Sequence, residues 1–336
     1  MLREAIIANG AARGRAVIRR SAIPLAAARG GQSLVSAASL VVVVNPAAGT
    51  GRAVAIFEAL RRAEPRLAAA VLIAPESAAA ARDELAQRLA AGAERVLALG
   101  GDGSFQLAGG AVLDAGAGDR VTLGLVAVGT GSDLARSLGL PRDPRAALDR
   151  ALDGAPRTID ALRATASDGR RRWAFNVASA GISAPVDEAV RSMRVKGRSA
   201  YLRATLAALL RYREVPCSVR LDGERWYEGP LLILAIANGR SFGNGMLVAP
   251  RAELDDGRAD AVLIAGVPRW RVALELPRIY TGGHLTRPHT RCGRARTVRV
   301  ALPGIAPPVL DLDGEAFPTT LETELTVVPR AVRVAV

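Results

Sequence analysis

The stretch Arg95-Val96-Leu97-Ala98-Leu99-Gly100-Gly101-Asp102-Gly103-Ser104 joins an apolar run to three glycines that surround one carboxylate. The apolar half predicts a buried strand, and the glycines predict a turn at its end. Residues without a Cβ readily adopt positive φ, so successive amides can converge on an anion. Asp102 beside that anion favours a cation between them. The stretch therefore indicates a nucleotide-phosphate loop with a metal, and a plain tight turn is the alternative.

Strand-like and helix-like segments alternate around this stretch. The expected strands cover residues 40–44, 70–73, 95–99 and 121–128. The expected helices cover residues 53–63, 78–91, 105–115 and 145–152. This alternation predicts an α/β domain with a parallel sheet and helices on both faces.

The pattern changes after Thr158 to many short β-type runs. They cover residues 158–164, 172–180, 218–221, 230–237, 259–265, 297–301 and 325–328. One helix is expected among them, at about residues 197–212. The second half is therefore predicted to be a mainly antiparallel β-sandwich domain.

The length of 336 residues favours two domains. We expect a basic extension at 1–37, an α/β domain at 38–155 and a β-rich domain at 156–336. An alternative is that the last strand returns to the first domain. The extension reads as a membrane-surface helix, a transit-like peptide or a frayed end.

The formal net charge of +13 favours a polyanionic partner. Aromatic residues make up only 4% and are scattered, so an anionic membrane surface ranks above nucleic acid. Two distant cysteines indicate neither a disulfide framework nor a zinc site. No apolar run approaches a membrane span. We expect a cytoplasmic, peripherally membrane-associated protein, with a homodimer left open.

Three further motifs lie where a nucleotide site needs them. Asn45-Pro46-x-x-Gly49-x-Gly51 and Gly129-Thr130-Gly131-Ser132-Asp133 each follow an expected strand and open a helix. Carboxyl ends of parallel strands share one edge, so these loops should meet Gly100 to Ser104. Asp311-Leu312-Asp313-Gly314-Glu315 could return to that edge and supply a general base, or be an ordinary Asp-Gly hairpin turn.

In this order, the four motifs resemble those of the diacylglycerol kinase catalytic-domain family, which includes bacterial lipid kinases and sphingosine kinases. The resemblance covers roughly residues 38–330. It implies an ATP cleft between the two domains and transfer of the γ-phosphoryl group to a lipid hydroxyl, with Mg²⁺. The acceptor expected from it is diacylglycerol or a related lipid.

The resemblance also assigns roles, with Glu315 as general base and Asp102 as a second catalytic residue. Leu254-Asp255-Asp256-Gly257 matches the family's magnesium stretch, which implies Asp256 as a side-chain ligand. Glu253 and Arg258 would then bind through main-chain carbonyls. The acids expected to reach the metal through water are Asp102, Asp133 and Asp160. The residues expected to bind the nucleotide are Asn45, Gly49, Gly51, Gly100, Gly101, Asp102, Gly103, Ser104, Gly129, Thr130 and Gly131.

Some residues depart from the family pattern. Many relatives follow the Gly-Gly-Asp-Gly loop with Thr and then Leu-Asn-Glu, where this chain has Ser104 and Phe105-Gln106-Leu107. Leu107 lacks the carboxylate. Two other functions stay open, an NAD-kinase-like enzyme with a soluble substrate and a noncatalytic nucleotide- or lipid-binding regulator. A basic cluster at Arg287, Arg291, Arg294, Arg296 and Arg299 reads equally as a membrane contact or a solvated strand face.

Overall fold

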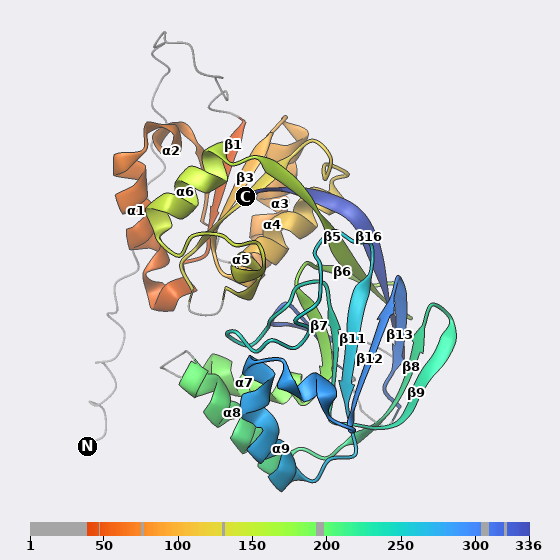
Figure 1. The fold of residues 1–336 in the computed structure, drawn as a ribbon. Helices are drawn as coiled ribbons and strands as arrows, with labels where there is room; N and C mark the ends of the chain where they lie inside the picture. Colours follow the sequence, from red (N-terminus) through yellow and green to blue (C-terminus); the bar gives the residue numbers. More distant parts are fainter. Residues whose placement is uncertain are drawn as a thin grey trace, which may run out of the picture. The chain divides into compact units, whose positions relative to one another are not determined.

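The computed structural model describes residues 39–336, except residues 47, 75–76, 130–131, 193–197, 304–308 and 319–320. The basic extension expected at residues 1–37 lies outside the described residues. Figure 1 shows the described part as one long sheet, whose parallel strands are covered by helices and whose antiparallel strands face a second sheet.

The first half is an α/β layer built on four parallel strands in the order β2-β1-β3-β4. These strands are β1 (Leu40–Val44), β2 (Val71–Ile73), β3 (Arg95–Gly100) and β4 (Thr122–Ala127). Every residue of β1 is buried. Both faces of the sheet are covered, so these strands are continuously apolar and do not alternate with polar residues.

Alternate residues of β1 face opposite helical layers. Val41 and Val43 share a core with α3 (Ala78–Ala90) and α4 (Asp102–Asp114). Val42 and Val44 share another core with the helices on the opposite face. Those helices are α1 (Ala53–Ala63), α2 (Pro65–Ala69) and α6 (Pro144–Asp153). The prediction of a parallel sheet with helices on both faces is confirmed.

The second half is a sandwich of two sheets that are mainly antiparallel. The first sheet continues from β4 through β16 (Glu322–Ala335), β13 (Thr297–Ala301), β8 (Val215–Leu221) and β9 (Glu224–Leu231). In the same sheet β5 (Pro156–Ala166) pairs with β16, and β6 (Arg171–Ala174) pairs with β5. The second sheet contains β12 (Thr290–Ala295), β11 (Ala259–Ile264), β10 (Ile233–Ala237), β7 (Val177–Gly181), β14 (Val309–Leu312) and β15 (Glu315–Pro318). Apolar side chains from both sheets form one core between them, as the predicted β-sandwich requires.

Two expected strands are each divided between the sheets. The run 172–180 becomes β6 and β7, which lie in different sheets because the chain turns at Phe175 and Asn176. The run 230–237 becomes the end of β9 and all of β10, with the change at Leu232. A β-type run does not reveal such a crossing, because the residues on both sides of it favour strand and the change of sheet depends on distant pairing partners.

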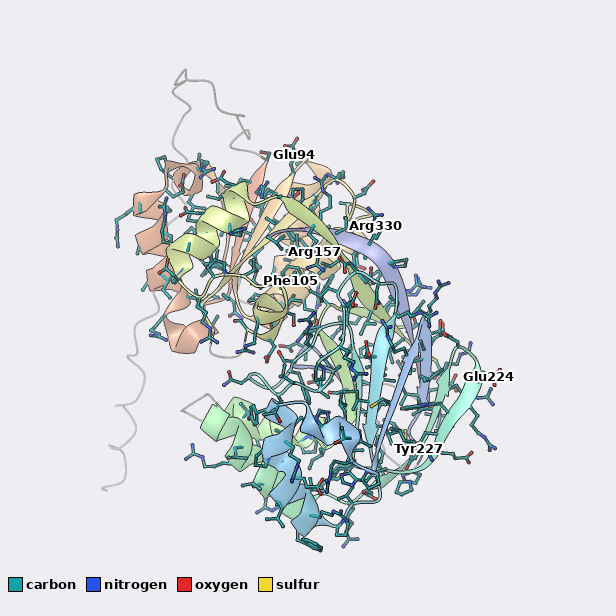
Figure 2. The ribbon with its side chains drawn as sticks, viewed as in Figure 1. Glu94, Phe105, Arg157, Glu224, Tyr227 and Arg330 are labelled. Carbon is teal, nitrogen blue, oxygen red and sulfur yellow. The ribbon has the colours of Figure 1, made fainter. Side chains whose placement is uncertain are left out.

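Strands β5 and β16 connect the two halves. They pair along most of their length, with an irregularity between Val328 and Val332, and β16 then runs parallel to β4 through Arg333 and Val334. At the irregularity the Arg330 amide donates to the Asp160 carboxylate at 2.7 Å. Figure 2 labels Arg157 and Arg330 on these two strands.

Three helices cover the outer face of the second sheet. They are α7 (Ser183–Ser192), α8 (Arg198–Arg211) and α9 (Arg269–Glu275), and they lie together in Figure 1. Ile182, Val186 and Leu209 pack there against Leu232. Only α8 was expected from the sequence, because α7 and α9 are short and α7 contains a proline. No helix among the described residues is long and apolar enough to cross a membrane.

Candidate active site

The loop after β3 leaves no room for a side chain at its first glycine. A Cβ on Gly100 would lie 2.0 Å from the Ser104 Oγ and 3.6 Å from the Asn45 Cβ. The amide of Asn45 donates to the carbonyl of Leu99 at 3.2 Å, so the loops after β1 and β3 touch. The buried Ser104 hydroxyl has no hydrogen-bond partner among the described residues. A free hydroxyl among the first amides of α4 suits a phosphate oxygen.

The loop after β1 also packs on the end of β4. Gly49 has a φ of +59°, and a Cβ there would lie 2.6 Å from the carbonyl oxygen of Val128. Gly51 has a φ of +87° with open space around it. Both positions therefore need the backbone freedom of glycine, and the close approach of Gly49 to the β4 end needs its small size as well.

The loop after β4 lies beside the loop after β3. A Cβ on Gly129 would be 3.8 Å from the Cα of Gly101. The three loops thus gather at one edge of the parallel sheet. Two predicted nucleotide-binding residues lie outside the described residues, Thr130 and Gly131.

Asp102 holds the start of α5 (Asp133–Ser137). Its two carboxylate oxygens accept from the amides of Asp133 and Leu134 at 3.0 and 3.1 Å. Burial raises the pKa of Asp102 to about 8, and the nearby Asp133 adds to this shift. The buried Asp133 carboxylate in turn accepts from the Ser241 hydroxyl at 3.0 Å and the Asn244 amide at 2.8 Å. The two acids therefore link the nucleotide loops to the segment that follows β10.

Glu315 reaches the phosphate loop through the β14–β15 hairpin. A Cβ on Gly103 would lie 3.2 Å from the Glu315 Oε1, so this carboxylate rests against the glycine. Beneath it the buried Gln106 Nε2 donates to the Leu312 carbonyl at 2.7 Å, across 206 positions of sequence. The structure thus brings the last motif of the sequence to the second.

Asp313 fixes the turn of this hairpin. It has a φ of +56°, and its carboxylate accepts from the amides of Phe175, Asn176 and Val177 at 2.7, 3.0 and 2.9 Å. Burial nevertheless raises its pKa to about 6, while the three hydrogen bonds act in the opposite direction. The direction of Glu315 therefore depends on the segment between β6 and β7.

A cavity of about 520 Å³ lies between these motifs. Asn45, Gly103, Ser104 and Glu315 all line it, and Leu107 contributes an apolar side chain. The cavity therefore joins the glycine loop after β3 and the carboxylate of Glu315 in one space.

Two arginines in the cavity wall were missed by the sequence analysis, Arg82 from α3 and Arg172 from β6. The Arg172 Nη1 donates to the Ala316 carbonyl at 2.9 Å, and its guanidinium lies 5.6 Å from the Phe317 ring centre. Burial lowers the pKa of Arg172, the nearby Arg82 lowers it further, and Glu315 opposes the shift. Arg172 stands in a run of three arginines, and only the register of β6 shows which one enters the cavity.

The residues expected to hold magnesium form a turn beside β12. The Asp256 carboxylate pairs with the guanidinium of Arg294 and accepts from the Arg258 amide at 2.9 Å. The part of the chain that the structure describes has no cluster of three or more His, Cys, Asp or Glu residues that could hold a metal. Other carboxylates lie near this turn, because burial, and with it the charge of Asp256, raises the pKa of both Asp160 and Asp260, and the Arg294 Nε also lies 3.6 Å from the Asp260 carboxylate. Oxygen donors suit Mg²⁺, which commonly keeps several waters beside one or two carboxylates. Magnesium at Asp256, with the main-chain carbonyls of Glu253 and Arg258, therefore stays a prediction.

The acids expected to share one water network fall into two groups. The buried Asp160 accepts from the amides of Gly257 and Arg330 at 2.6 and 2.7 Å. Burial raises its pKa, with smaller contributions from Asp256 and Asp255. Asp160 thus lies with the turn that contains Asp256. Asp102 and Asp133 instead lie together at the start of α5.

Two family models match this chain in succession. The diacylglycerol kinase catalytic domain matches residues 39–164, and the YegS C-terminal NAD kinase beta sandwich-like domain matches residues 176–336. Their boundary falls close to the start of β7, where the second sheet begins.

Curated relatives and solved structures agree with these matches. The chain is 35% identical over 298 residues to a diacylglycerol kinase of Mycobacterium tuberculosis H37Rv, covering 88% of this chain and 94% of the relative. It is 32% identical over 238 residues to a Xanthomonas oryzae protein named "Probable lipid kinase YegS-like", covering 69% and 75%. The fold resembles a crystal structure of a diacylglycerol kinase from Bacillus anthracis, with a TM-score of 0.63, 16% identity and coverage of 88% and 96%. The chain therefore belongs to the diacylglycerol kinase catalytic-domain family.

Proposed function

We propose that this kinase-family member uses magnesium-bound ATP to phosphorylate the hydroxyl of a lipid, diacylglycerol or a close relative of it. The observation that carries the proposal is the contact of Glu315 with Gly103 at the wall of one cavity. A proton acceptor and a phosphate-binding loop then face the same reacting atoms. The names of the curated relatives support a lipid as the acceptor.

The phosphate chain of the nucleotide would lie on the glycine loop. Amides at the start of α4 and the free hydroxyl of Ser104 would bind its oxygens. Arg82 and Arg172 line the same cavity and would balance the charge that develops on the transferred group. Magnesium would enter with the nucleotide and neutralise part of the phosphate charge.

Glu315 would receive the proton of the acceptor. The lipid oxygen attacks the γ-phosphorus, the bond from that phosphorus to the bridging oxygen of ADP breaks, and the hydroxyl proton passes to the Glu315 carboxylate. The products are a lipid phosphate and ADP. Asp102 would position the loops that hold the donor, because both of its oxygens bind backbone amides.

Transfer of labelled phosphate from ATP to a panel of lipids in mixed micelles tests this proposal. Diacylglycerol, monoacylglycerol, ceramide and a sphingoid base should be compared with NAD as a soluble acceptor. We expect incorporation into a glycerolipid and none into NAD. Phosphorylation of NAD alone would reject the lipid assignment, and nucleotide binding without any transfer would favour a regulator.

A further inference from the structure

Helix α9 turns two large apolar side chains toward solvent. Trp270 and Leu274 lie one helical turn apart and are 67% and 69% exposed. Val272 and Ala273, on the opposite side of the same helix, pack against the core under α7 and α8. The outward face of α9 is therefore apolar without any packing requirement inside the protein.

Helix α8 contacts α9 and extends this surface (Figure 1). Leu202 and Leu206 of α8, again one turn apart, are 39% and 37% exposed. The sequence of α8 contains three arginines and no acid. We call the outer surface of these two helices the α8–α9 face.

Exposed arginines lie on α8 and in the segments that directly follow α8 and α9. They are Arg203 and Arg211 on α8, Arg213 after α8 and Arg278 after α9, and none of them makes an ion pair with a described carboxylate. Two acids with described side chains lie close to these helices in the sequence, and both have partners. Glu275 pairs with Arg271, Arg287 and His289, and Glu214 accepts from the Gly266 amide at 3.0 Å.

The basic cluster that the sequence suggested has a different character. Arg287, Arg294 and Arg299 each pair with a carboxylate. The cluster is also divided, since Arg291 and Arg294 lie on β12 and Arg299 lies on β13, which belongs to the other sheet. Carboxylates of the fold therefore neutralise three of the five arginines in this cluster. The exposed arginines near α8 and α9 have no such described partner.

The α8–α9 face is linked to the candidate site through neighbouring elements. Helix α7 contacts both α8 and β14, the strand that leads into the Asp313-Gly314-Glu315 turn. A membrane that touches α8 and α9 would therefore meet the protein near the hairpin that carries Glu315.

We infer that the α8–α9 face docks on an anionic phospholipid bilayer, with Trp270 and Leu274 inserted at the headgroup boundary. Exposed Trp and Leu with unpaired arginines near them in the chain are the composition of an interfacial helix surface. An anionic surface also complements the excess of arginines here. The inference rests on the proposed function only in that the bilayer would supply the lipid acceptor.

Vesicle sedimentation tests the inference without any turnover. The full chain should bind vesicles with about 30% phosphatidylglycerol at least about tenfold better than phosphatidylcholine vesicles, and added salt should weaken this binding. The double variant Trp270→Ala/Leu274→Ala should lose about tenfold or more of the binding. Leu321→Ala is the matched control, because Leu321 is 79% exposed outside the α8–α9 face. It should stay within about twofold of the wild type.

Quenching of tryptophan fluorescence by brominated lipids is a second measurement. It does not require that the double variant folds. Fluorescence of the wild type should be quenched on anionic vesicles, and Trp270→Phe should lose most of that quenching, although Trp173 and Trp226 remain. Activity of the double variant on detergent-dispersed diacylglycerol should equal that of the wild type, which separates docking from catalysis.

Three results would overturn the inference. They are equal binding to both vesicle types, wild-type binding by the double variant, and a dimer in size-exclusion chromatography that the double variant abolishes. The last result would assign the α8–α9 face to a second copy of this chain.

Discussion

Gly100 and Gly101 are adjacent glycines with opposite tolerance for a side chain. A Cβ on Gly100 would meet the Ser104 Oγ at 2.0 Å and the Ser104 Cβ at 2.7 Å, whereas a Cβ on Gly101 meets nothing within 4 Å. We expect Gly100→Ala to lower the free energy of unfolding by about 1–3 kcal/mol. Gly101→Ala, the matched control, should unfold close to the wild type. Equal urea midpoints for both variants would contradict the crowded turn at Gly100.

Arg172 is expected to act on the nucleotide phosphates. Its guanidinium is fixed by the Ala316 carbonyl and the Phe317 ring at the wall of the cavity. Arg172→Gln should raise the KM for ATP or lower kcat by about tenfold or more, because a charge at the phosphates is lost. Arg172→Lys should recover part of the loss, since it keeps the charge but not the planar group.

The neighbouring Arg171 supplies the control for Arg172. It is exposed and does not line the cavity. Arg171→Gln should leave both kinetic constants within about twofold of the wild type. Similar losses in the two variants would assign the effect to general surface charge.

Glycine and carboxylate motifs could be read from the sequence because each has a local backbone consequence. The loops at Gly49, Gly100 and Gly129 follow strands, and the parallel order of those strands gathers them at one edge. Arg82 and Arg172 could not be found this way. The positions of these two side chains depend on which face of α3 and which face of β6 point into the cavity. Nearly all basic residues of this chain are arginines, so residue type alone does not distinguish these two.

At the scale of the element, the β14–β15 hairpin depends on the charge state of Asp313. Burial raises the pKa of this acid to about 6 from its ordinary 3.8, so the folded state binds the proton more tightly than the unfolded state. Its contribution to stability is then largest below about pH 4 and falls as the pH rises through about 6.

Comparison with Asp313→Asn isolates this contribution. The wild type should lose free energy of unfolding relative to the variant as the pH rises from about 4 to 7. Urea denaturation at each pH measures the difference. A relative gain in wild-type stability over that range would mean that the three amide hydrogen bonds outweigh burial.

Most strands and helices of the α/β half were predictable within a few residues, since buried strands and amphipathic helices have distinct periods. Helix α4 begins at Asp102, three residues before its predicted start, because glycines in the first turn weaken the helical pattern. In the sandwich, the crossings at Phe175 and Leu232 were hidden, because both sheets bury their inner faces. The pairing of Asp256 with Arg294 was hidden as well, since it joins separate segments across a turn.

At the scale of the molecule, β16 ties the nucleotide half to the sandwich. It pairs with β13 and β5 in the sandwich and with β4 in the parallel sheet. Val334 is fully buried where β16 meets β4. We expect Val334→Ala to cost about 2 kcal/mol and to destabilise both halves together.

Circular dichroism and fluorescence during urea unfolding check this coupling. The two signals should coincide in the wild type and shift together in Val334→Ala. Glu322→Ala, at the exposed start of the same strand, should change little. Two separate transitions in the wild type would show that β16 does not couple the halves.

Glu315 is the residue proposed to accept the proton of the lipid hydroxyl. The most direct measurement is the kcat for phosphoryl transfer from ATP to diacylglycerol in mixed micelles by the wild type, Glu315→Gln and Glu224→Gln. Glu224, labelled in Figure 2, is an exposed acid on the β8–β9 hairpin and serves as the control. We predict that Glu315→Gln loses at least about 100-fold in kcat with nucleotide affinity and melting temperature retained, while Glu224→Gln matches the wild type. Wild-type turnover by Glu315→Gln would contradict this proposal.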